Sequence, residues 1–163
     1  MMPIEIVEAD LSEPTHAAHY LALMDHFALD PQAGGSPIPA SARERLVPAL
    51  RERSDVTILL AYAGSEPVGL ATCIESFSTF AARALWNLHD MVVVATHRGR
   101  GIGAKLLDEL ERRARQRGYC KITLEVLSGN LRAQAVYRRA GYAGYTLDPT
   151  HGAGLFWQKS LED

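Results

Sequence analysis

The sequence predicts an α/β (α+β) fold in which a mixed, mostly antiparallel sheet of six to seven strands is flanked by about four helices. Residues 56–62 and 68–77 are rich in β-branched residues and surround a Gly-Ser-Glu-Pro turn, which indicates a hairpin of two strands. Residues 102–114 carry apolar side chains at helical spacing after a glycine-rich start. Strand-like and helix-like segments alternate without a linker over 163 residues, so we expect a single domain over residues 1–163.

The first third of the chain is the least regular part. Residues 3–9 suit a strand, and Ser12 followed by Pro14 starts a helix that runs to about residue 29. Residues 30–40 hold three prolines and two glycines and are expected to form a loop. Ser41 then opens a short helix that reaches about residue 53, with a kink at Pro48.

The later elements follow the change in apolar period. After the hairpin, residues 85–94 form a strand, and the helix that starts after the glycine-rich turn stops at Gly118. Residues 121–126 alternate as a strand, and a helix from Asn130 ends at Gly141, a residue suited to a left-handed cap. Residues 142–147 and 154–161 are expected to be two closing strands.

Composition excludes several classes of protein. With 17 Lys+Arg against 19 Asp+Glu, the net charge is −2 and the pI about 6.3, whereas nucleic-acid and anionic-membrane partners favour a large positive excess. The N-terminus lacks a basic start followed by an apolar run, and no apolar stretch approaches the ~20 residues of a membrane span. We therefore expect a cytoplasmic protein without nucleic-acid or membrane partners, whose Cys73 and Cys120 are buried, reduced thiols.

Residues 92–105 form the most informative segment, a strand that runs through a basic, glycine-dense turn into a helix. Glycines let the backbone approach an anion closely, and free N–H groups at the helix start meet its negative charge. The turn lacks the Gly-Lys-Ser/Thr ending of an ATPase phosphate loop, and its glycine spacing differs from that of a dinucleotide fingerprint. The basic turn from Arg98 to Ala104 thus has the features of an anion site that belongs to neither of these two types.

Two linked motifs resemble the GNAT acetyltransferase superfamily. The turn carries Arg98-x-x-Gly101-x-Gly103, which is similar to that family's pyrophosphate-binding signature. The following strand and helix bring the family's Asn-x-x-Ala-x-x-x-Tyr pattern at Asn130, Ala133 and Tyr137. The resemblance is best over about residues 55–147 and implies the GNAT fold.

The resemblance implies a site for acetyl-CoA, used as a co-substrate, and no metal. The pantetheine amides would bond to backbone at Met91, Val92 and Val93, and the pyrophosphate would lie on the amides of residues 98–104. Asn130 has two readings, because its side chain either orders the cofactor or caps its own helix.

The activity implied by the resemblance is transfer of an acetyl group from acetyl-CoA to a primary amine by direct attack in a ternary complex. The acceptor is expected to be a small molecule rather than a protein lysine. Tyr137 occupies the position from which the family protonates the departing thiolate. Acidic residues such as Asp25 and Asp30 would favour a cationic acceptor.

A base must remove a proton from the amine, whose pKa is near ~10.4. The candidates are His89, Glu75 and Asp90, with a water chain as a further option. Strict alternation places His89 on the strand face of Asn87 and Met91 and places Asp90 on the opposite face.

A second function class stays open, namely a non-catalytic acyl-CoA-binding sensor or partner module on the same fold. Such a module would keep the glycine-rich turn but would not need Tyr137 or a base. The resemblance also leaves a homodimer open, because many members of the family pair through sheet edges or C-terminal strands.

Overall fold

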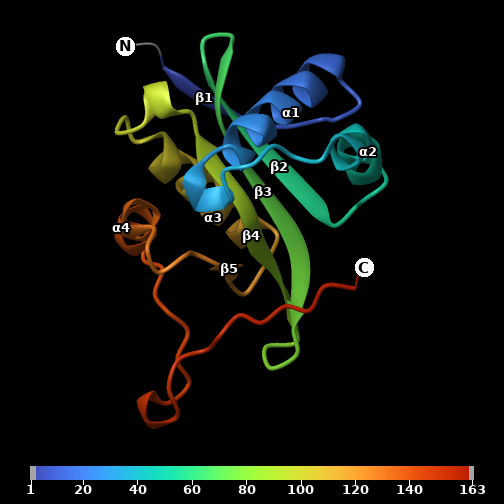
Figure 1. The fold of residues 1–163 in the computed structure, drawn as a ribbon. Coiled ribbons are helices and arrows are strands. Elements are labelled where there is room, and N and C mark those ends of the chain that lie inside the picture. The colour runs from blue at the N-terminus through green and yellow to red at the C-terminus, as the bar shows by residue number, and fades with distance from the viewer. Residues whose placement is uncertain (1–2, 162–163) are drawn as a thin grey trace. The chain divides into compact units, whose positions relative to one another are not determined.

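The computed structural model describes residues 3–161, which divide into one unit that ends at Leu124 and a second that begins at Glu125 (Figure 1). The first unit holds a sheet and three α-helices, and the second holds one α-helix. The N-terminal strand, the middle helices and the glycine-rich turn therefore belong to the first unit, whereas Asn130 and Tyr137 belong to the second.

The sheet has five strands in the order β1-β2-β3-β4-β5. The first four pair antiparallel and β5 runs parallel to β4, which confirms the mixed, mostly antiparallel arrangement. The strands are β1 (Ile4–Glu8), β2 (Val56–Ala63), β3 (Glu66–Ser78), β4 (Arg83–Val93) and β5 (Ile122–Leu124).

Helix α1 (Pro14–Ala28) covers one face of this sheet, and Pro14 occupies its first turn. Its buried Tyr20 and Leu23 pack with Leu70 of β3 and Val92 of β4. Helix α2 (Ala40–Arg51) adds half-buried apolar side chains to the same cluster. A single 3-10 turn, η1 (Pro31–Ala33), lies in the loop between the two helices.

Helix α3 (Ile102–Gln116) covers the opposite face. Its apolar residues are buried at the helical spacing predicted, namely Ile102, Leu106, Leu107, Leu110 and Ala114. Gly69 of β3 lies directly beneath the first turn, because a Cβ there would stand 3.4 Å from side-chain atoms of both Ile102 and Leu106. The same Cβ would stand 3.0 Å from the Val92 carbonyl oxygen, so glycine allows α3 to approach the sheet at this point.

In the second unit, α4 (Leu131–Arg139) ends before Gly141, which has the left-handed φ of +87° that the sequence predicted. The closing strands expected at residues 142–147 and 154–161 are wrong: the described chain beyond Leu124 contains no strand. One backbone hydrogen bond, from Gly154 N–H to the Tyr145 carbonyl at 3.2 Å, joins these segments. A strand needs a ladder of such bonds, which explains why the sheet has five strands instead of six to seven.

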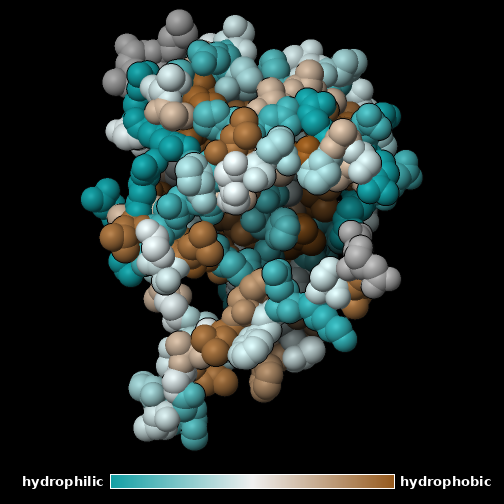
Figure 2. Space-filling view, viewed as in Figure 1, coloured by the Kyte–Doolittle hydropathy of each residue, from teal (hydrophilic) through white to brown (hydrophobic). Residues whose placement is uncertain are grey.

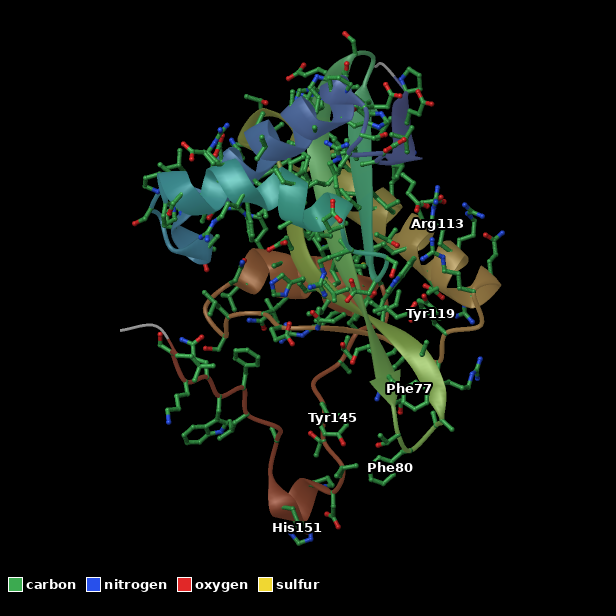
Figure 3. All side chains as sticks on the ribbon, turned by 90° about the vertical axis from the view of Figure 1, so that its right-hand side faces the viewer. Phe77, Phe80, Arg113, Tyr119, Tyr145 and His151 are labelled. Atoms are coloured by element: carbon green, nitrogen blue, oxygen red, sulfur yellow. The ribbon has the colours of Figure 1, made fainter. Side chains whose placement is uncertain are left out.

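The surface of the first unit mixes polar and apolar side chains. On the face seen in Figure 2, hydrophilic and hydrophobic side chains are interspersed over α1 and its surroundings. Phe77 and Phe80 lie toward the tip of the β3–β4 hairpin, as Figure 3 shows, and both are exposed. Among residues 3–161, no helix has the length and apolar character required to cross a membrane.

Candidate active site

Strand β4 has two different edges. Antiparallel pairing with β3 continues along it as far as Val93, whereas β5 pairs only with Trp86, Asn87 and Leu88. Within the first unit, residues 89–93 thus have a strand neighbour on the β3 side and none on the other. This stretch contains the backbone of Met91, Val92 and Val93, where the sequence predicted pantetheine binding. An extended molecule with amide groups can hydrogen-bond to such an edge.

The glycine-rich turn follows directly. A 3-10 turn, η2 (Ala95–His97), leads from β4 to Gly99 and Gly101, which both have φ of +77°. A Cβ at either glycine would meet nothing within 4 Å, so backbone conformation and not space requires glycine there. Gly101 is the N-cap of α3. Because glycine has no side chain, it cannot accept a hydrogen bond from the first amides of the helix, as a serine or aspartate at the N-cap would. The first amides of α3, at Ile102, Gly103 and Ala104, have no acceptor within the helix and can bind an anion.

The two arginines of the turn make contacts within the protein. Arg98 Nε donates to the Val93 carbonyl at 2.9 Å, and its terminal nitrogen lies 2.7 Å from Asp30 Oδ2. Arg100 donates to the Thr96 carbonyl at 3.1 Å. The guanidinium of Arg98 is therefore already engaged within the protein, and its backbone N–H donates to the Ala95 carbonyl at 3.4 Å.

The acids expected to favour a cationic acceptor are paired with arginines. Asp25 forms a two-pronged pair with Arg43 of α2, with nitrogen–oxygen distances of 2.8 to 3.0 Å. Asp30 pairs with Arg98. Because both carboxylates have a cationic partner, we assign neither of them to the acceptor.

A β-bulge at His89 overturns the strict alternation that the sequence predicted. Thr72 of β3 lies opposite Asp90, but the next residue, Cys73, lies opposite Leu88, so His89 is an extra residue in β4. Its side chain is exposed. An extra residue resets the alternation, and Asp90 therefore shares the α1 face with Asn87, while Met91 lies on the α3 face.

Asp90 belongs to a buried polar cluster on the α1 face. Burial raises the pKa of Asp90, and the positive charge of His89 and the Thr72 hydroxyl oppose that rise. Burial also raises the pKa of Tyr20 to about 12, against the effect of the Thr72 hydroxyl. Thr72 Oγ1 is buried and, in the described part of the chain, has no partner at normal hydrogen-bond geometry, although it is close enough to act on both pKa values. The main effect of the cluster is thus an upward shift in the pKa of Asp90, caused by burial.

Glu75, the third candidate base, lies elsewhere. It follows Cys73 by two residues on the α3 face of β3 and accepts a hydrogen bond from the Tyr119 hydroxyl. Tyr119 lies just beyond the end of α3 (Figure 3) and stacks edge-on against Trp86, with 5.2 Å between ring centroids. The structure thus places Asp90 on the α1 face of the sheet and Glu75 on the α3 face.

Asn130 and Tyr137 lie on the second unit. Asn130 Oδ1 accepts a hydrogen bond from Ala133 N–H at 3.1 Å, which is the helix-capping role left open by the sequence. Tyr137 is half-buried, its ring lies 6.0 Å from that of Tyr142, and burial raises its pKa. A raised pKa keeps the hydroxyl of Tyr137 protonated, as a proton donor requires.

The cysteines differ in exposure. Cys73 is fully buried and burial raises the pKa of its thiol to about 12, whereas Cys120 is only half-buried. The expectation of a buried thiol is confirmed for Cys73 and is wrong for Cys120, which precedes β5 at the end of the sheet and lies near the Arg83 carbonyl.

Sequence reasoning missed Tyr20, Thr72 and the role of Asp30. Thr72 is a polar residue at an inward position of an apolar strand, two residues after Leu70, and this break in the pattern is the signal that could have found it. Tyr20 stands three residues before Leu23 on the buried stripe of α1. The ion pair between Asp30 and Arg98 joins residues 68 positions apart, and sequence spacing carries no information about it.

Comparison with known proteins bears on the family and the fold of this chain. Residues 20–142 match the acetyltransferase (GNAT) family. An uncharacterized N-acetyltransferase of Bacillus subtilis is 29% identical over 99 residues, which cover 61% of this chain and 66% of that protein. The thialysine N-epsilon-acetyltransferase of Bos taurus is 34% identical over 74 residues, which cover 45% of this chain and 43% of the relative. The matched segments thus span less than two thirds of the length of these relatives.

Solved structures share the fold over nearly the whole chain. A probable acetyltransferase superposes with a TM-score of 0.80 at 24% identity, over 97% of this chain and 99% of the other. An aminoglycoside N-acetyltransferase in complex with CoA superposes with a TM-score of 0.75 at 16% identity, over 98% and 96% of the two chains. Because the family match runs from Tyr20 through the glycine-rich turn to Tyr142 and covers most of the sequence, the chain belongs to the acetyltransferase (GNAT) family.

Proposed function

We propose that this protein transfers the acetyl group of acetyl-CoA to a primary amine on a small molecule, by direct attack in a ternary complex. The observation that carries the proposal is that two elements suited to binding CoA follow each other directly in the chain. Among the described residues of the first unit, the edge of β4 at residues 89–93 has no strand neighbour on the side away from β3. It leads directly into the Gly99–Gly101 turn and the start of α3, where no side-chain cap is found among the described residues.

Each element suits one part of CoA. The backbone of Met91, Val92 and Val93 would hydrogen-bond to the pantetheine amides. The amides of residues 98–104, together with the positive end of the α3 dipole, would hold the pyrophosphate. Both elements lie in the first unit, so this part of the proposal needs no residue from the second.

The amine must lose a proton before it attacks. We assign this step to the consecutive residues His89 and Asp90, of which His89 is the extra residue of the bulge. A group with a pKa near the working pH is the best general base, and burial moves the pKa of Asp90 upward in that direction. Glu75, bonded to Tyr119 on the other face of the sheet, takes no part in this assignment.

The proposed reaction forms one carbon–nitrogen bond and breaks one carbon–sulfur bond. The neutral amine nitrogen attacks the thioester carbonyl carbon, and the carbon–sulfur bond breaks. The base, which has passed the first proton on to solvent, then accepts the second proton from the nitrogen. The hydroxyl of Tyr137 protonates the departing thiolate, so the products are an N-acetylated amine and CoA. Cys73 is not used as an acyl carrier, because its buried thiol with a pKa of about 12 supplies almost no thiolate.

The acceptor class rests on the known proteins that this chain resembles. One structural neighbour is an aminoglycoside N-acetyltransferase and one relative is a thialysine N-epsilon-acetyltransferase. Both names denote small amines, which supports a small cationic acceptor over a protein lysine. We assign no membrane or nucleic-acid partner.

Two measurements test the proposal. Calorimetry measures the Kd of the purified chain for acetyl-CoA and for CoA. A thiol-reactive dye then measures CoA release with a panel of polyamines, amino acids, aminoglycosides and a lysine peptide. We expect binding of both cofactor forms and release that depends on at least one small amine.

The outcomes separate the competing functions. Binding without release for any amine would favour the acyl-CoA-binding sensor. Release with the lysine peptide alone would correct the acceptor class. Failure to bind either cofactor form would overturn the proposal itself.

A further inference from the structure

We propose that Asp30 is a positioning residue for the CoA-binding turn: its ion pair with Arg98 fixes the start of the turn against the loop at residues 30–36. The inference rests on the proposed function, because it takes the glycine-rich turn as the CoA site. It assigns the arginine of the motif, Arg98, to a contact within the protein and gives a role to a loop that lies far away in the sequence.

Asp30 accepts three hydrogen bonds from its own loop. Its side-chain Oδ1 accepts from Gln32 N–H at 2.9 Å, and its carbonyl accepts from Ala33 N–H at 2.8 Å and Gly35 N–H at 3.1 Å. A further contact, from Oδ2 to Arg98, leaves the loop. The carboxylate thus has one oxygen in the loop and one toward the turn.

Arg98 is held in a matching way. Its Nε donates to the carbonyl of Val93, the last residue of β4, while a terminal nitrogen reaches Asp30. The guanidinium therefore closes the segment from residue 93 to residue 98 and ties it to the loop. The Arg98 and Asp30 side chains are 29% and 19% exposed, so this pair is better shielded from solvent than the pair of Arg43 and Asp25, at 44% and 37%.

For removal of Asp30, the proposal predicts a change in CoA affinity opposite to the one that charge repulsion alone predicts. Asp30 places a negative charge beside a site for a polyanion, so Coulomb repulsion alone predicts that its removal tightens CoA binding. If Asp30 instead positions Arg98, its removal releases the turn and weakens binding. The sign of the change in Kd decides between the two.

The experiment measures CoA affinity by calorimetry for the wild type and for Asp30→Asn, which keeps an oxygen for the Gln32 amide. We expect a Kd raised about five- to tenfold. Asp30→Glu, which restores the carboxylate, is expected to bind more tightly than Asp30→Asn. Asp25→Asn is the matched control: it removes the same charge and also breaks a pair with an arginine, and its Kd should stay within about twofold of the wild type.

A second arm tests the pairing itself. Arg98→Lys keeps the positive charge but lacks the planar fork that reaches Val93 and Asp30 together. We expect Arg98→Lys to weaken CoA binding as much as Asp30→Asn does, and the double variant to bind no more weakly than either single variant. Hydrogen exchange at the Gln32, Ala33 and Gly35 amides should become faster in both single variants.

The results distinguish failure of this inference from failure of the proposed function. Wild-type protein that does not bind CoA would overturn the proposed function. Wild-type binding together with equal or tighter binding by Asp30→Asn would overturn the positioning role alone. So would additive losses in the double variant, which would indicate that Arg98 contacts the phosphates directly, or an equal loss in Asp25→Asn.

Discussion

Thr72 and Asp90 lie directly opposite each other on β3 and β4, at the last register position before the bulge at His89. Thr72 is 3% exposed, and its hydroxyl opposes the rise in the pKa of Asp90 that burial causes. A buried hydroxyl that lacks a hydrogen bond of normal geometry costs stability, so we infer that it serves the carboxylate.

Thr72→Val is expected to separate these two effects. The substitution keeps the shape of the side chain, removes a buried polar atom without a good partner, and should change the free energy of unfolding by less than about 1 kcal/mol. It also removes a group that favours the ionised Asp90, so the acid limb of the pH–rate profile should move to higher pH. Urea unfolding and turnover as a function of pH check the two parts.

Thr57→Val is the matched control for stability. Thr57 is also buried in the sheet, but its hydroxyl accepts a hydrogen bond from Arg117 at 3.0 Å. Its loss should cost about 1–2 kcal/mol. Equal destabilisation by the two substitutions would show that the Thr72 hydroxyl is well bonded, contrary to our interpretation.

Asp90→Asn is expected to stabilise the protein at neutral pH while it lowers turnover. The folded-state pKa of Asp90 is raised above its ordinary value of 3.8, so folding favours the protonated form. The stability associated with that form is fully present below the unfolded-state pKa and is lost as pH rises through the folded-state pKa. The variant lacks this loss, and its advantage should be of order 1 kcal/mol at pH 7.

Measurement of the unfolding free energy of wild type and Asp90→Asn at low pH is the control for this prediction. Unfolding free energies of wild type and Asp90→Asn should converge below about pH 4, where the unfolded chain also protonates the aspartate. A constant difference at all pH values would mean that the substitution acts through packing. A variant less stable at pH 7 would contradict a raised pKa.

Most of the fold could be predicted because the apolar residues of each buried helix or strand recur at the spacing typical of that element. The α3 stripe from Ile102 to Ala114 and the β2–β3 hairpin were predicted from the sequence. The expected closing strands failed for a related reason: residues 142–147 and 154–161 resemble strands locally, but pairing decides whether they are strands, and the single bond between Gly154 and Tyr145 does not form a ladder.

The part of the candidate site that depends on backbone conformation could be predicted from the sequence. Gly99 and Gly101 were identified from residue type and have the left-handed φ that only glycine adopts easily. The face of Asp90 was not predictable, because a one-residue bulge leaves no clear mark in the sequence and reverses every later side chain. Long-range contacts such as the one between Asp30 and Arg98 were equally beyond sequence patterns.

Tyr137→Phe is expected to lower turnover by about 10²-fold without a change in the Kd for CoA. The hydroxyl is the proton donor in the proposed reaction, whereas binding uses the backbone of the first unit. Tyr145→Phe, which removes the hydroxyl of an exposed tyrosine in the same unit, should leave both quantities unchanged. If Tyr137→Phe keeps full turnover, another group protonates the thiolate.

The pH–rate profile gives a second measure of the same role. Burial raises the pKa of Tyr137, so the hydroxyl stays protonated to higher pH than in a free tyrosine. Loss of activity by ionisation of this group should therefore begin at a higher pH in the wild type than the ionisation of a free tyrosine would give. The Tyr137→Phe variant should lack that basic limb.

Gly69→Ala is expected to destabilise the protein by about 1–3 kcal/mol. The added methyl would stand 3.0 Å from the rigid Val92 carbonyl and 3.4 Å from Ile102 and Leu106, which forces α3 away from the sheet. Gly144→Ala adds the same methyl where nothing lies within 4 Å and should have little effect on unfolding in urea. Similar stabilities for the two variants would show that α3 has room to move.

Cys73 and Cys120 should differ in their reaction with a thiol reagent at pH 8. Cys73 is fully buried and its pKa is raised to about 12, so it presents neither access nor thiolate, whereas Cys120 is partly accessible. We expect one rapidly modified thiol per native chain and two per chain in denaturant. Cys73→Ala should retain turnover within about threefold, because direct attack by the amine needs no acylated cysteine. Trapping of an acetyl group on Cys73 during turnover would instead establish a covalent route. Such a route would require a much lower pKa for that thiol in the complex with substrate.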